Sequence, residues 1–369
     1  MRDKNLLKVD RVLLIYFFFI VSFGLAALFS ASTPVGYAKF GDAWFFVKRQ
    51  IVLGLIPGLI AGYILYQTDL DFIRKFSWTI YILSLGFLVL VFIPPVGMAI
   101  NNSRSWINFF GLTFQPSEFS KLAIVIILAY LLSQRKYDWG NWQTSLLPVL
   151  AILSPTLVLI LMQPDIGTLS IIIAEIFVML FIAKVPIRYL LILGLIGVVS
   201  FVSLIIAAPY RAQRITTFLN PELDPRGRGY QMNQAFLAVG SGGFWGRGFG
   251  QSRQKYQYLP EVSADTIFAV IAEENGFIIS SALIVLILLI IWRGFKIGMA
   301  SHDPFGALLV TGIMVWFGWQ SFLNIGATVG ALPLTGVPLP FVSHGGSALA
   351  TALAGAGIVL NLSRNSNIS

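Results

Sequence analysis

The sequence predicts an all-α, polytopic membrane protein with about ten transmembrane helices and one large extracellular loop. Three observations support this fold class. Apolar residues make up 57% of the 369 residues, whereas charged residues make up only 11%. The mean hydropathy is +0.81, well above what a soluble core needs. The apolar residues also gather in runs of roughly 20, the length at which a helix crosses a bilayer.

Ten such runs follow one another along the chain. They lie at about 12–31, 46–66, 76–95, 118–134, 145–162, 167–184, 188–208, 266–292, 304–325 and 344–362. The first run has no convincing cleavage site, so we expect a retained helix rather than a signal peptide. We interpret residues 1–369 as one membrane domain. Its large loop spans about 209–264, between seven predicted helices and three more.

Basic residues indicate the orientation of these helices. Short segments on one side of the predicted membrane hold thirteen: Arg2, Lys4, Lys8, Arg11, Arg74, Lys75, Arg135, Lys136, Lys184, Arg188, Arg293, Lys296 and Arg364. The other side holds only Lys39, Lys48, Arg49 and Arg104 in short segments, with Lys121 just inside a helix. By the positive-inside rule, the first side is cytoplasmic and both termini lie there.

The predicted external loop is rich in glycine and in basic residues. Its basic residues are Arg211, Arg214, Arg226, Arg228, Arg247, Arg253 and Lys255. Glycines allow a ligand to approach the backbone closely, so the loop suggests a site for an anionic substrate, although it lacks the spacing of a nucleotide-binding loop. The alternative is a solvated loop that binds phospholipid. Long loops cross the membrane regardless of their charge, so the topology stands.

The composition excludes several chemistries. The chain has no cysteine and only two histidines, which rules out disulfides, thiolate metal sites, cysteine nucleophiles and histidine-rich metal sites. The net charge of +9 suits a protein that meets anionic lipid or phosphate. Nothing in the sequence indicates a nucleic-acid partner.

Asp265 is the principal candidate for a catalytic residue. It lies in the run from Tyr258 to Ala269, at the boundary between the polar loop and an apolar helix. A carboxylate at a membrane boundary is expensive and is usually functional.

Two polar motifs precede the loop. Glu118 and Lys121 are three residues apart on one predicted helix face, where they either contact substrate or form a structural ion pair. Arg104 has no acid nearby in the sequence and is a candidate phosphate ligand. Asp165, in the motif Gln163–Thr168, either caps the next helix or contributes to a polar cavity or metal site.

A further motif, Pro333–Ser347, contains three prolines and three glycines before and after Ser343 and His344. This pattern predicts a re-entrant or broken segment, which is tolerated at membrane depth only inside protein or beside a wet cavity. His344 is expected to titrate near neutral pH or to be structural. Every polar motif falls on the external side, which predicts one external, partly embedded cavity. Glu273 and Glu274 lie roughly 12 Å deeper and are expected to tie helices together or to meet a basic partner.

These motifs together resemble the SEDS family (shape, elongation, division and sporulation), which includes FtsW, RodA and SpoVE, and they are most similar to the FtsW branch. The matching pieces, in order, are Ser30–Ser32, Arg104–Trp106, Gln115–Glu118, Gln163–Gly167, Gly240–Gly243, Ser252–Lys255, Tyr258–Glu261, Asp265, Ile267–Ala269, Glu273–Glu274, Pro338–Ser343 and Gly345–Gly346. They span nearly the whole chain. Two positions depart from the family pattern: Ser263–Ala264 replaces His-Thr before the aspartate, and His344 replaces a tyrosine.

The resemblance implies a peptidoglycan glycosyltransferase that polymerises lipid II in the bacterial cytoplasmic membrane, for cell division or elongation. It implies ten spans, catalysis by Asp265, and a divalent cation, Mg²⁺ or Mn²⁺, for which Asp265 is a possible ligand. It also implies a class B penicillin-binding protein as partner, among other division or elongation proteins. Candidate substrate-binding residues are Arg104, Glu118, Lys121, Asp165, Arg253, Lys255, Glu261, Ser343 and His344.

Two other functions remain open at this stage. Broken helices and intramembrane acids are also typical of transporters, so a lipid II flippase is one alternative. A transporter would place its acids near the bilayer midplane, whereas here most of them fall on the external side. A non-catalytic scaffold of the division machinery is the second alternative, although it would leave Asp265 unexplained.

Overall fold

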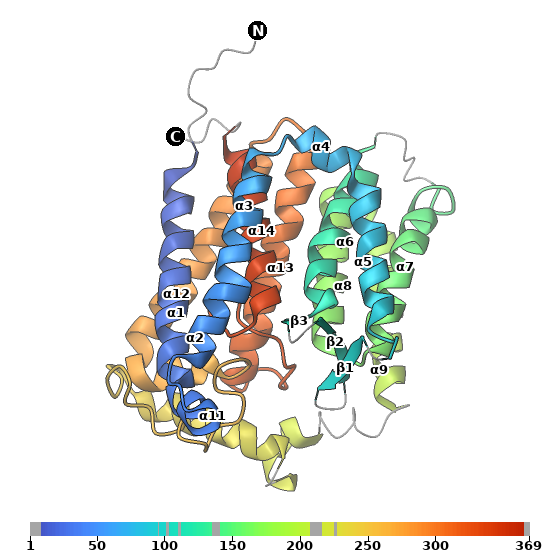
Figure 1. The fold of residues 1–369 in the computed structure, drawn as a ribbon. Helices are drawn as coiled ribbons and strands as arrows, with labels where there is room; N and C mark the ends of the chain where they lie inside the picture. The colour runs from blue at the N-terminus through green and yellow to red at the C-terminus, as the bar shows by residue number, and fades with distance from the viewer. Residues whose placement is uncertain are drawn as a thin grey trace.

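The computed structural model describes residues 9–94, 96–100, 103–109, 112–134, 141–206, 216–224 and 227–364. The basic residues Arg2, Lys4, Lys8, Arg135, Lys136, Arg211, Arg214 and Arg226 lie outside these ranges. The described chain forms a bundle of long helices with roughly parallel axes (Figure 1). The helices are α1 (Arg11–Phe40), α2 (Phe45–Gln50), the π-helical η1 (Ile51–Leu55), α3 (Ile56–Gln67), α4 (Leu70–Lys75), α5 (Ser77–Leu90), α6 (Pro116–Ser133), α7 (Leu146–Met162), α8 (Ile166–Ile182), α9 (Ile187–Ile206), the 3-10 turn η2 (Pro221–Leu223), α11 (Arg228–Gly242), α12 (Ile267–Met299), α13 (Pro304–Thr328) and α14 (Gly346–Ser363).

Each of the ten predicted spans falls on an apolar helix or on a continuous run of helices. Among the described residues, six helical segments are long and apolar enough to cross a membrane, and four shorter apolar helices accompany them. Helix ends follow local chemistry. Asp10 caps α1 by accepting the Leu13 N–H at 2.9 Å, and Asp303 caps α13 just before Pro304. The polytopic membrane fold predicted from the sequence is therefore confirmed.

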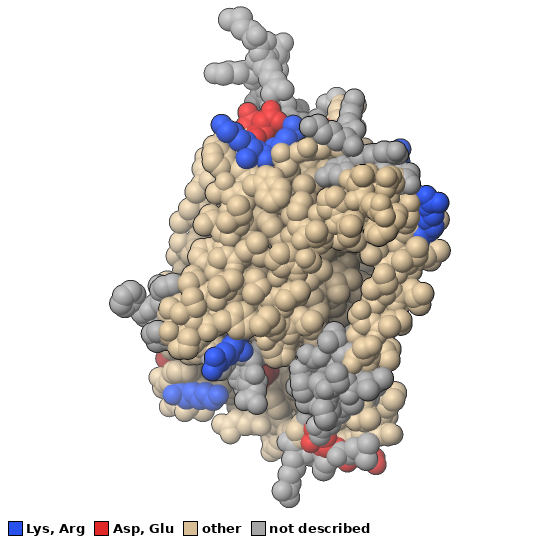
Figure 2. Space-filling view, turned by 90° about the vertical axis from the view of Figure 1, so that its right-hand side faces the viewer, with Lys and Arg blue, Asp and Glu red and all other residues tan. Residues whose placement is uncertain are grey.

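Charge is arranged as a membrane protein requires. On the face drawn in Figure 2, the charged side chains lie toward the two ends of the molecule and a broad uncharged band separates them. The start of α1 and the end of α14 meet at one end, where the Asp10 N–H donates to Ser363 Oγ at 3.2 Å. Arg293 of α12 pairs with Asp10 at the same place, at 2.7 Å. An even number of crossings explains this arrangement.

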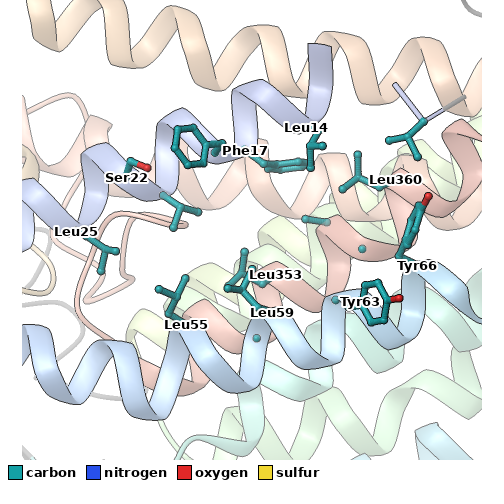
Figure 3. Close-up of a pocket in the computed structure, with 17 residues that line it drawn as sticks. Leu14, Phe17, Ser22, Leu25, Leu55, Leu59, Tyr63, Tyr66, Leu353 and Leu360 are labelled. Carbon is teal, nitrogen blue, oxygen red and sulfur yellow. The ribbon is translucent and has the colours of Figure 1, made fainter. Parts of the chain in front are cut away.

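The core of the bundle consists of α6, α13 and α14, whose side chains are mostly buried, whereas α1, α3 and α12 expose many apolar side chains. Small residues allow close packing between α3 and α14, as where Gly62 lies against Leu353. Between α1, α3 and α14 a partly open apolar cavity of about 570 Å³ remains, lined by residues such as Phe17, Leu59 and Leu360 (Figure 3).

Two features depart from the sequence-based prediction. The segment between α5 and α6 forms a small antiparallel sheet, β1 (Gly97–Ile100), β2 (Ser103–Phe109) and β3 (Leu112–Phe114), so the fold is not purely helical. The predicted helix 266–292 is broken at Gly276, whose φ of 70° and ψ of −171° are not helical. The glycine-rich stretch of the large loop, residues 240–255, packs at this break. There the Arg247 and Gly248 N–H groups donate to the carbonyls of Glu273 and Glu274 at 3.0 and 2.9 Å.

Candidate active site

A buried non-helical segment, residues 333–345, connects α13 to α14 and organises the site. Its apolar side chains Val337, Leu339 and Phe341 are each at most 5% exposed. Two of its backbone carbonyls accept hydrogen bonds from side-chain amides on α13. Gln320 Nε2 donates to the Pro338 carbonyl and Asn324 Nδ2 to the Val337 carbonyl, both at 2.8 Å. The predicted broken segment is therefore present, and its polar backbone is bonded as membrane depth requires.

Asp265 lies on the turn that precedes α12, and three consecutive carbonyls of this turn accept hydrogen bonds from segment 333–345 and from α13. Ser343 Oγ donates to the Ala264 carbonyl at 2.6 Å, and the His344 N–H donates to the Ser263 carbonyl at 2.7 Å. Asn324 Nδ2 of α13 donates to the Asp265 carbonyl at 2.9 Å while it also holds Val337. The backbone of Asp265 is thereby fixed, and the residue as a whole is only partly buried.

Gly336 leaves the space beside this carboxylate. It adopts a φ of +76°, a left-handed conformation that side chains other than glycine rarely adopt. A Cβ at Gly336 would lie 3.5 Å from Asp265 Oδ2. On the opposite side, Gly167 of α8 packs closely against Thr335 and Val337. The segment therefore lies between the start of α8 and Asp265.

The surroundings of Asp265 favour its protonated form. Desolvation, followed by the charges of Glu261 and Asp165, raises the pKa of Asp265 from 3.8 to about 7. A carboxyl group with this pKa is divided between its acid and base forms near neutral pH. Such tuning is typical of a general acid or base.

Asp165 has the capping role that was one of its two predicted interpretations. Its Oδ1 accepts the Thr168 N–H at 3.0 Å and its Oδ2 accepts the Thr168 hydroxyl at 2.8 Å, at the start of α8. Its charge nevertheless acts on Asp265. Asp165 therefore belongs to the site through electrostatics as well as capping α8.

Glu118 and Lys121 form the ion pair that was the structural interpretation of these two residues. Lys121 is 0% exposed, and its Nζ lies 2.9 Å from Glu118 and 2.7 Å from Gln320 Oε1. It also lies over the ring of Trp316. Because Gln320 in turn holds Pro338, the pair is connected to segment 333–345. Contact of either residue with substrate stays a prediction, and their burial does not favour it.

Lys255 is buried and paired within the protein, so its predicted role as a substrate ligand stays a prediction that its surroundings do not favour. It is 3% exposed, pairs with Glu274 at 2.7 Å and donates to Ser30 Oγ at 3.1 Å. The neighbouring Glu273 carboxylate accepts the Ser252 hydroxyl at 2.6 Å and the Arg253 N–H at 3.0 Å. The glycine-rich stretch thus uses its polar groups to bind α12, which confirms the expectation that the two glutamates tie elements together.

Ser343, through its hydroxyl, and His344, through its N–H, hold the backbone beside Asp265, and their predicted contact with substrate stays a prediction. Burial, and secondarily the charge of Arg49, lower the pKa of His344 to about 4. The expectation that His344 titrates near neutral pH is therefore wrong, since the imidazole is neutral there. Its ring packs edge-on against Phe46, and the hydroxyl of Ser343 is used within the turn.

Three predicted substrate-binding residues remain accessible. Arg104 on β2, Arg253 in the large loop and Glu261 beside Asp265 have exposed side chains. None of the three has an ion-pair partner among the described residues. Their role as ligands stays a prediction.

The protein groups do not form a metal site on their own. Within the described ranges, no three Asp, Glu or His residues are grouped so that they could hold an ion. Both oxygens of Asp165 accept hydrogen bonds at the start of α8. The predicted divalent cation stays a prediction.

Sequence reasoning missed three amides and one cation. Gln320 and Asn324 are buried in α13, and Gln50 clamps the end of segment 333–345 by donating to the Ser343 carbonyl and accepting the Gly345 N–H. The cation is Arg49, next to Gln50, whose positive charge acts on His344 and to which the sequence analysis assigned no role in the site. Amides four residues apart in an apolar helix were the available signal, because such groups need buried partners.

This bundle, with an ionisable site at one end and a buried non-helical segment beneath it, defines a polytopic membrane protein with an interfacial polar site. A family model described as "Cell cycle protein", which groups FtsW, RodA and SpoVE, matches residues 10–368. The chain therefore belongs to this family, the SEDS family that the motifs indicated.

Individual relatives agree. The chain is 41% identical to stage V sporulation protein E of Bacillus subtilis over 97% of each chain. It is 35% identical to a probable peptidoglycan glycosyltransferase FtsW of Geobacter sp. strain M18 over 96% of each. Among solved structures, it matches a chain of a peptidoglycan synthase complex that coordinates polymerization and crosslinking. That match has a TM-score of 0.78 and 28% identity, over 98% of this chain and 99% of that one. It also matches the RodA protein of Thermus thermophilus, with a TM-score of 0.72 and 29% identity over 99% and 100% of the two chains.

Proposed function

We propose that the chain is a peptidoglycan glycosyltransferase that polymerises lipid II, a disaccharide-pentapeptide carried on undecaprenyl pyrophosphate. The family and the names of its relatives support this activity. The reaction joins the 4-hydroxyl of an acceptor to the anomeric carbon of the growing chain, and the lipid pyrophosphate leaves. A base must take the hydroxyl proton, and cations must stabilise the departing pyrophosphate.

Asp265 is proposed as the base, and its environment is the observation that carries the proposal. Its carbonyl is held by Asn324 of α13, the preceding residue is held by Ser343, and its carboxylate lies beside Gly336. A pKa of about 7 makes the carboxylate a competent proton acceptor near neutral pH. A positioned base is typically worth roughly 10²- to 10⁴-fold in rate. A single base suits displacement in one step with inversion at the anomeric carbon.

The accessible arginines Arg104 and Arg253 are proposed to bind the anionic parts of the substrate. Guanidinium groups match phosphate oxygens with two parallel hydrogen bonds. A divalent cation stays part of the proposal as a ligand of the substrate's pyrophosphate, because Mg²⁺ usually binds through one or two carboxylates together with phosphate oxygens. Its expected effect is to neutralise charge on the leaving group.

The proposed orientation places both termini in the cytoplasm and Asp265 at the outer face of the cytoplasmic membrane. The charge bias of the short segments supports it, as does the position of the site at the end of the bundle opposite the start of α1 (Figure 1). A class B penicillin-binding protein is proposed as the partner, alongside other division or elongation proteins. The similarity to a synthase complex that couples polymerization to crosslinking supports such a partner.

A lipid II flippase is the second candidate, and one observation favours it. Glu175 on α8 is fully buried, and neither of its oxygens accepts a hydrogen bond from the described part of the chain. Intramembrane acids of this kind mark ion or substrate pathways in transporters. Asp265, in contrast, lies outside the membrane-spanning helices, which favours chemistry at the interface.

The test is glycan-chain formation from lipid II by the purified protein with a divalent cation, with and without a class B partner. We expect polymer from the wild type and none from a well-folded Asp265→Asn variant. Polymer from both proteins would keep the enzyme and remove Asp265 from the mechanism. No polymer from the wild type, even with a cognate partner, would favour the flippase.

A further inference from the structure

Arg49 on α2 carries a charge that no acid of the described chain neutralises. Its neighbour Lys48 is paired with Asp42 at 2.8 Å, whereas Arg49 has no ion pair among the described residues. Arg49 is partly exposed as a residue, and its Nη2 donates to the Thr113 hydroxyl on β3 at 3.0 Å. A guanidinium has five N–H donors, so this contact leaves several free for an anion.

The position of Arg49 is tied to the same segment as Asp265. The next residue, Gln50, is 2% exposed and holds the Ser343 carbonyl at 3.2 Å and the Gly345 N–H at 2.9 Å. Between these two residues, the His344 N–H holds the carbonyl of Ser263, two residues before Asp265. One short stretch of chain therefore fixes the cation on one side and the carboxylate on the other.

A second exposed cation lies on the strand beside Thr113. Thr113 of β3 is paired directly with Asn108 of β2, so both project from the same face. Arg104, near the start of β2, is exposed, whereas Ser105 and Ile107 are buried. The pairing of β2 with β1 is irregular between Trp106 and Arg104, so strict alternation does not extend from Asn108 to Arg104. Arg104 is four residues from Asn108, up to roughly 14 Å along the strand, so the Arg49–Thr113 contact is considered without it.

We propose that Arg49 and Thr113 form a binding site for the pyrophosphate of the lipid-linked glycan. The proposal rests on the proposed function and specifies where its substrate is held. A guanidinium next to a hydroxyl offers parallel donors to phosphate oxygens. Arg49 also stands where an apolar helical run begins, since α2 continues through η1 into α3. A phosphate there can have its lipid chain in the bilayer. The phosphate of an ordinary anionic phospholipid shares this chemistry, so the test must separate the two sources.

The experiment measures binding of lipid II to the protein in nanodiscs of zwitterionic lipid. The variants are Arg49→Gln, Arg49→Lys and Thr113→Val, and the matched control is Lys48→Gln. The control removes the same charge from the adjacent residue, whose side chain is 67% exposed and already paired with Asp42. Loss of a hydrogen bond to a charged group predicts that Arg49→Gln weakens binding roughly 10- to 100-fold. We expect Arg49→Lys to recover only part of this loss, Thr113→Val to weaken binding by less than Arg49→Gln does, and the control to change binding less than about twofold.

Competition identifies the source of the phosphate. Undecaprenyl pyrophosphate should displace lipid II from the wild type, while phosphatidylglycerol added to the nanodisc at the same concentration should not. Equal displacement by phosphatidylglycerol would overturn the pyrophosphate assignment and indicate a general headgroup site. Equal losses in Arg49→Gln and Lys48→Gln would overturn the site itself, because only the overall charge would then matter.

Two further readings keep this proposal separate from the proposed function. If Arg49→Gln polymerises lipid II with unchanged KM and unchanged binding, the pyrophosphate site is wrong and the enzyme stands. If the wild type makes no polymer but binds lipid II through Arg49, the enzyme is wrong and the site stands. If Arg49→Gln does not fold, Thr113→Val decides, since valine is similar in volume and lacks the hydroxyl that accepts from Arg49 and could donate to phosphate.

Discussion

The charge of Glu261 should set the pH at which the proposed enzyme switches on. Glu261 is the largest cause of the raised pKa of Asp265 after desolvation, and it is exposed, so its replacement by glutamine should not disturb packing. Removing a negative charge next to an acid favours ionisation of that acid. We therefore expect Glu261→Gln to lower the pKa of Asp265 and to shift the acidic limb of the rate profile to lower pH.

The magnitude follows from the charge and its surroundings. A unit charge about 10 Å away at an effective dielectric constant of ~20 contributes ~1.7 kcal/mol, and exposure of Glu261 reduces this to ~1.4 kcal/mol or less. That corresponds to a shift of the acidic limb by at most about one pH unit. Below the pKa of Asp265, the rate of Glu261→Gln should therefore exceed that of the wild type by at most about tenfold, with no gain above about pH 8.

The assay is the initial rate of glycan polymerisation between about pH 5.5 and 8.5 for the wild type, Glu261→Gln and a control, Glu222→Gln. Glu222 is an exposed glutamate on η2 of the same loop and is not a cause of the pKa of Asp265. The reasoning is refuted if the acidic limb of Glu261→Gln coincides with that of the wild type. It is also refuted if the limb moves to higher pH, or if Glu222→Gln moves it equally.

Three further predictions concern stability and geometry. Because the pKa of Asp265 is raised in the native state, its ionisation opposes folding progressively as pH rises from 3.8 to about 7, by at most ~4 kcal/mol. The melting temperature of Asp265→Asn should therefore exceed that of the wild type at about pH 8 and equal it at about pH 4. If the two proteins had the same melting temperature at both pH values, the prediction would be wrong. Gly336→Ala should strain the left-handed backbone by about 1–2 kcal/mol and reduce polymerisation roughly tenfold or more, whereas Gly41→Ala, with a φ of +67° and no atom within 4 Å of its Cβ, should leave activity intact; equal activity losses would show that strain alone is responsible. Lys121→Met should leave Glu118 buried without its partner and lower the free energy of unfolding by about 3–5 kcal/mol. Adding Glu118→Gln to the same chain should restore most of this stability in a thermal melt. No recovery would mean that the loss does not come from the unpaired charge of Glu118.

Hydropathy and charge were sufficient to predict the helices, because bilayer thickness dictates segment length and the backbone must bond internally. They could not predict the three short strands, whose stability depends on pairing between neighbours in the loop. The break at Gly276 was equally hidden, since a glycine inside an apolar run is often tolerated as helix.

The position of the site could be predicted from the sequence, but many of the contacts between its residues could not. Asp265 and segment 333–345 were identified from local sequence, because an acid at a boundary and clustered prolines are local signals. The partner of Lys255 was not, because Ser30 lies 225 residues away and no local pattern records that contact. The clamp from Gln50 to Ser343 spans 293 residues in the same way. The sequence alone therefore did not distinguish basic residues that are buried in ion pairs, such as Lys121 and Lys255, from those that are exposed to solvent, such as Arg104 and Arg253.

The glycine-rich stretch of the large loop has a consequence for how substrate reaches the site. It is bound to α12 through Glu273 and Glu274, and both carboxylates are at most 2% exposed. Lifting this stretch would strip two buried charges of their partners, at several kcal/mol each. It is therefore a fixed wall and not a lid that opens during turnover. Entry and exit of lipid and glycan must take place around it, along surfaces that already stand open.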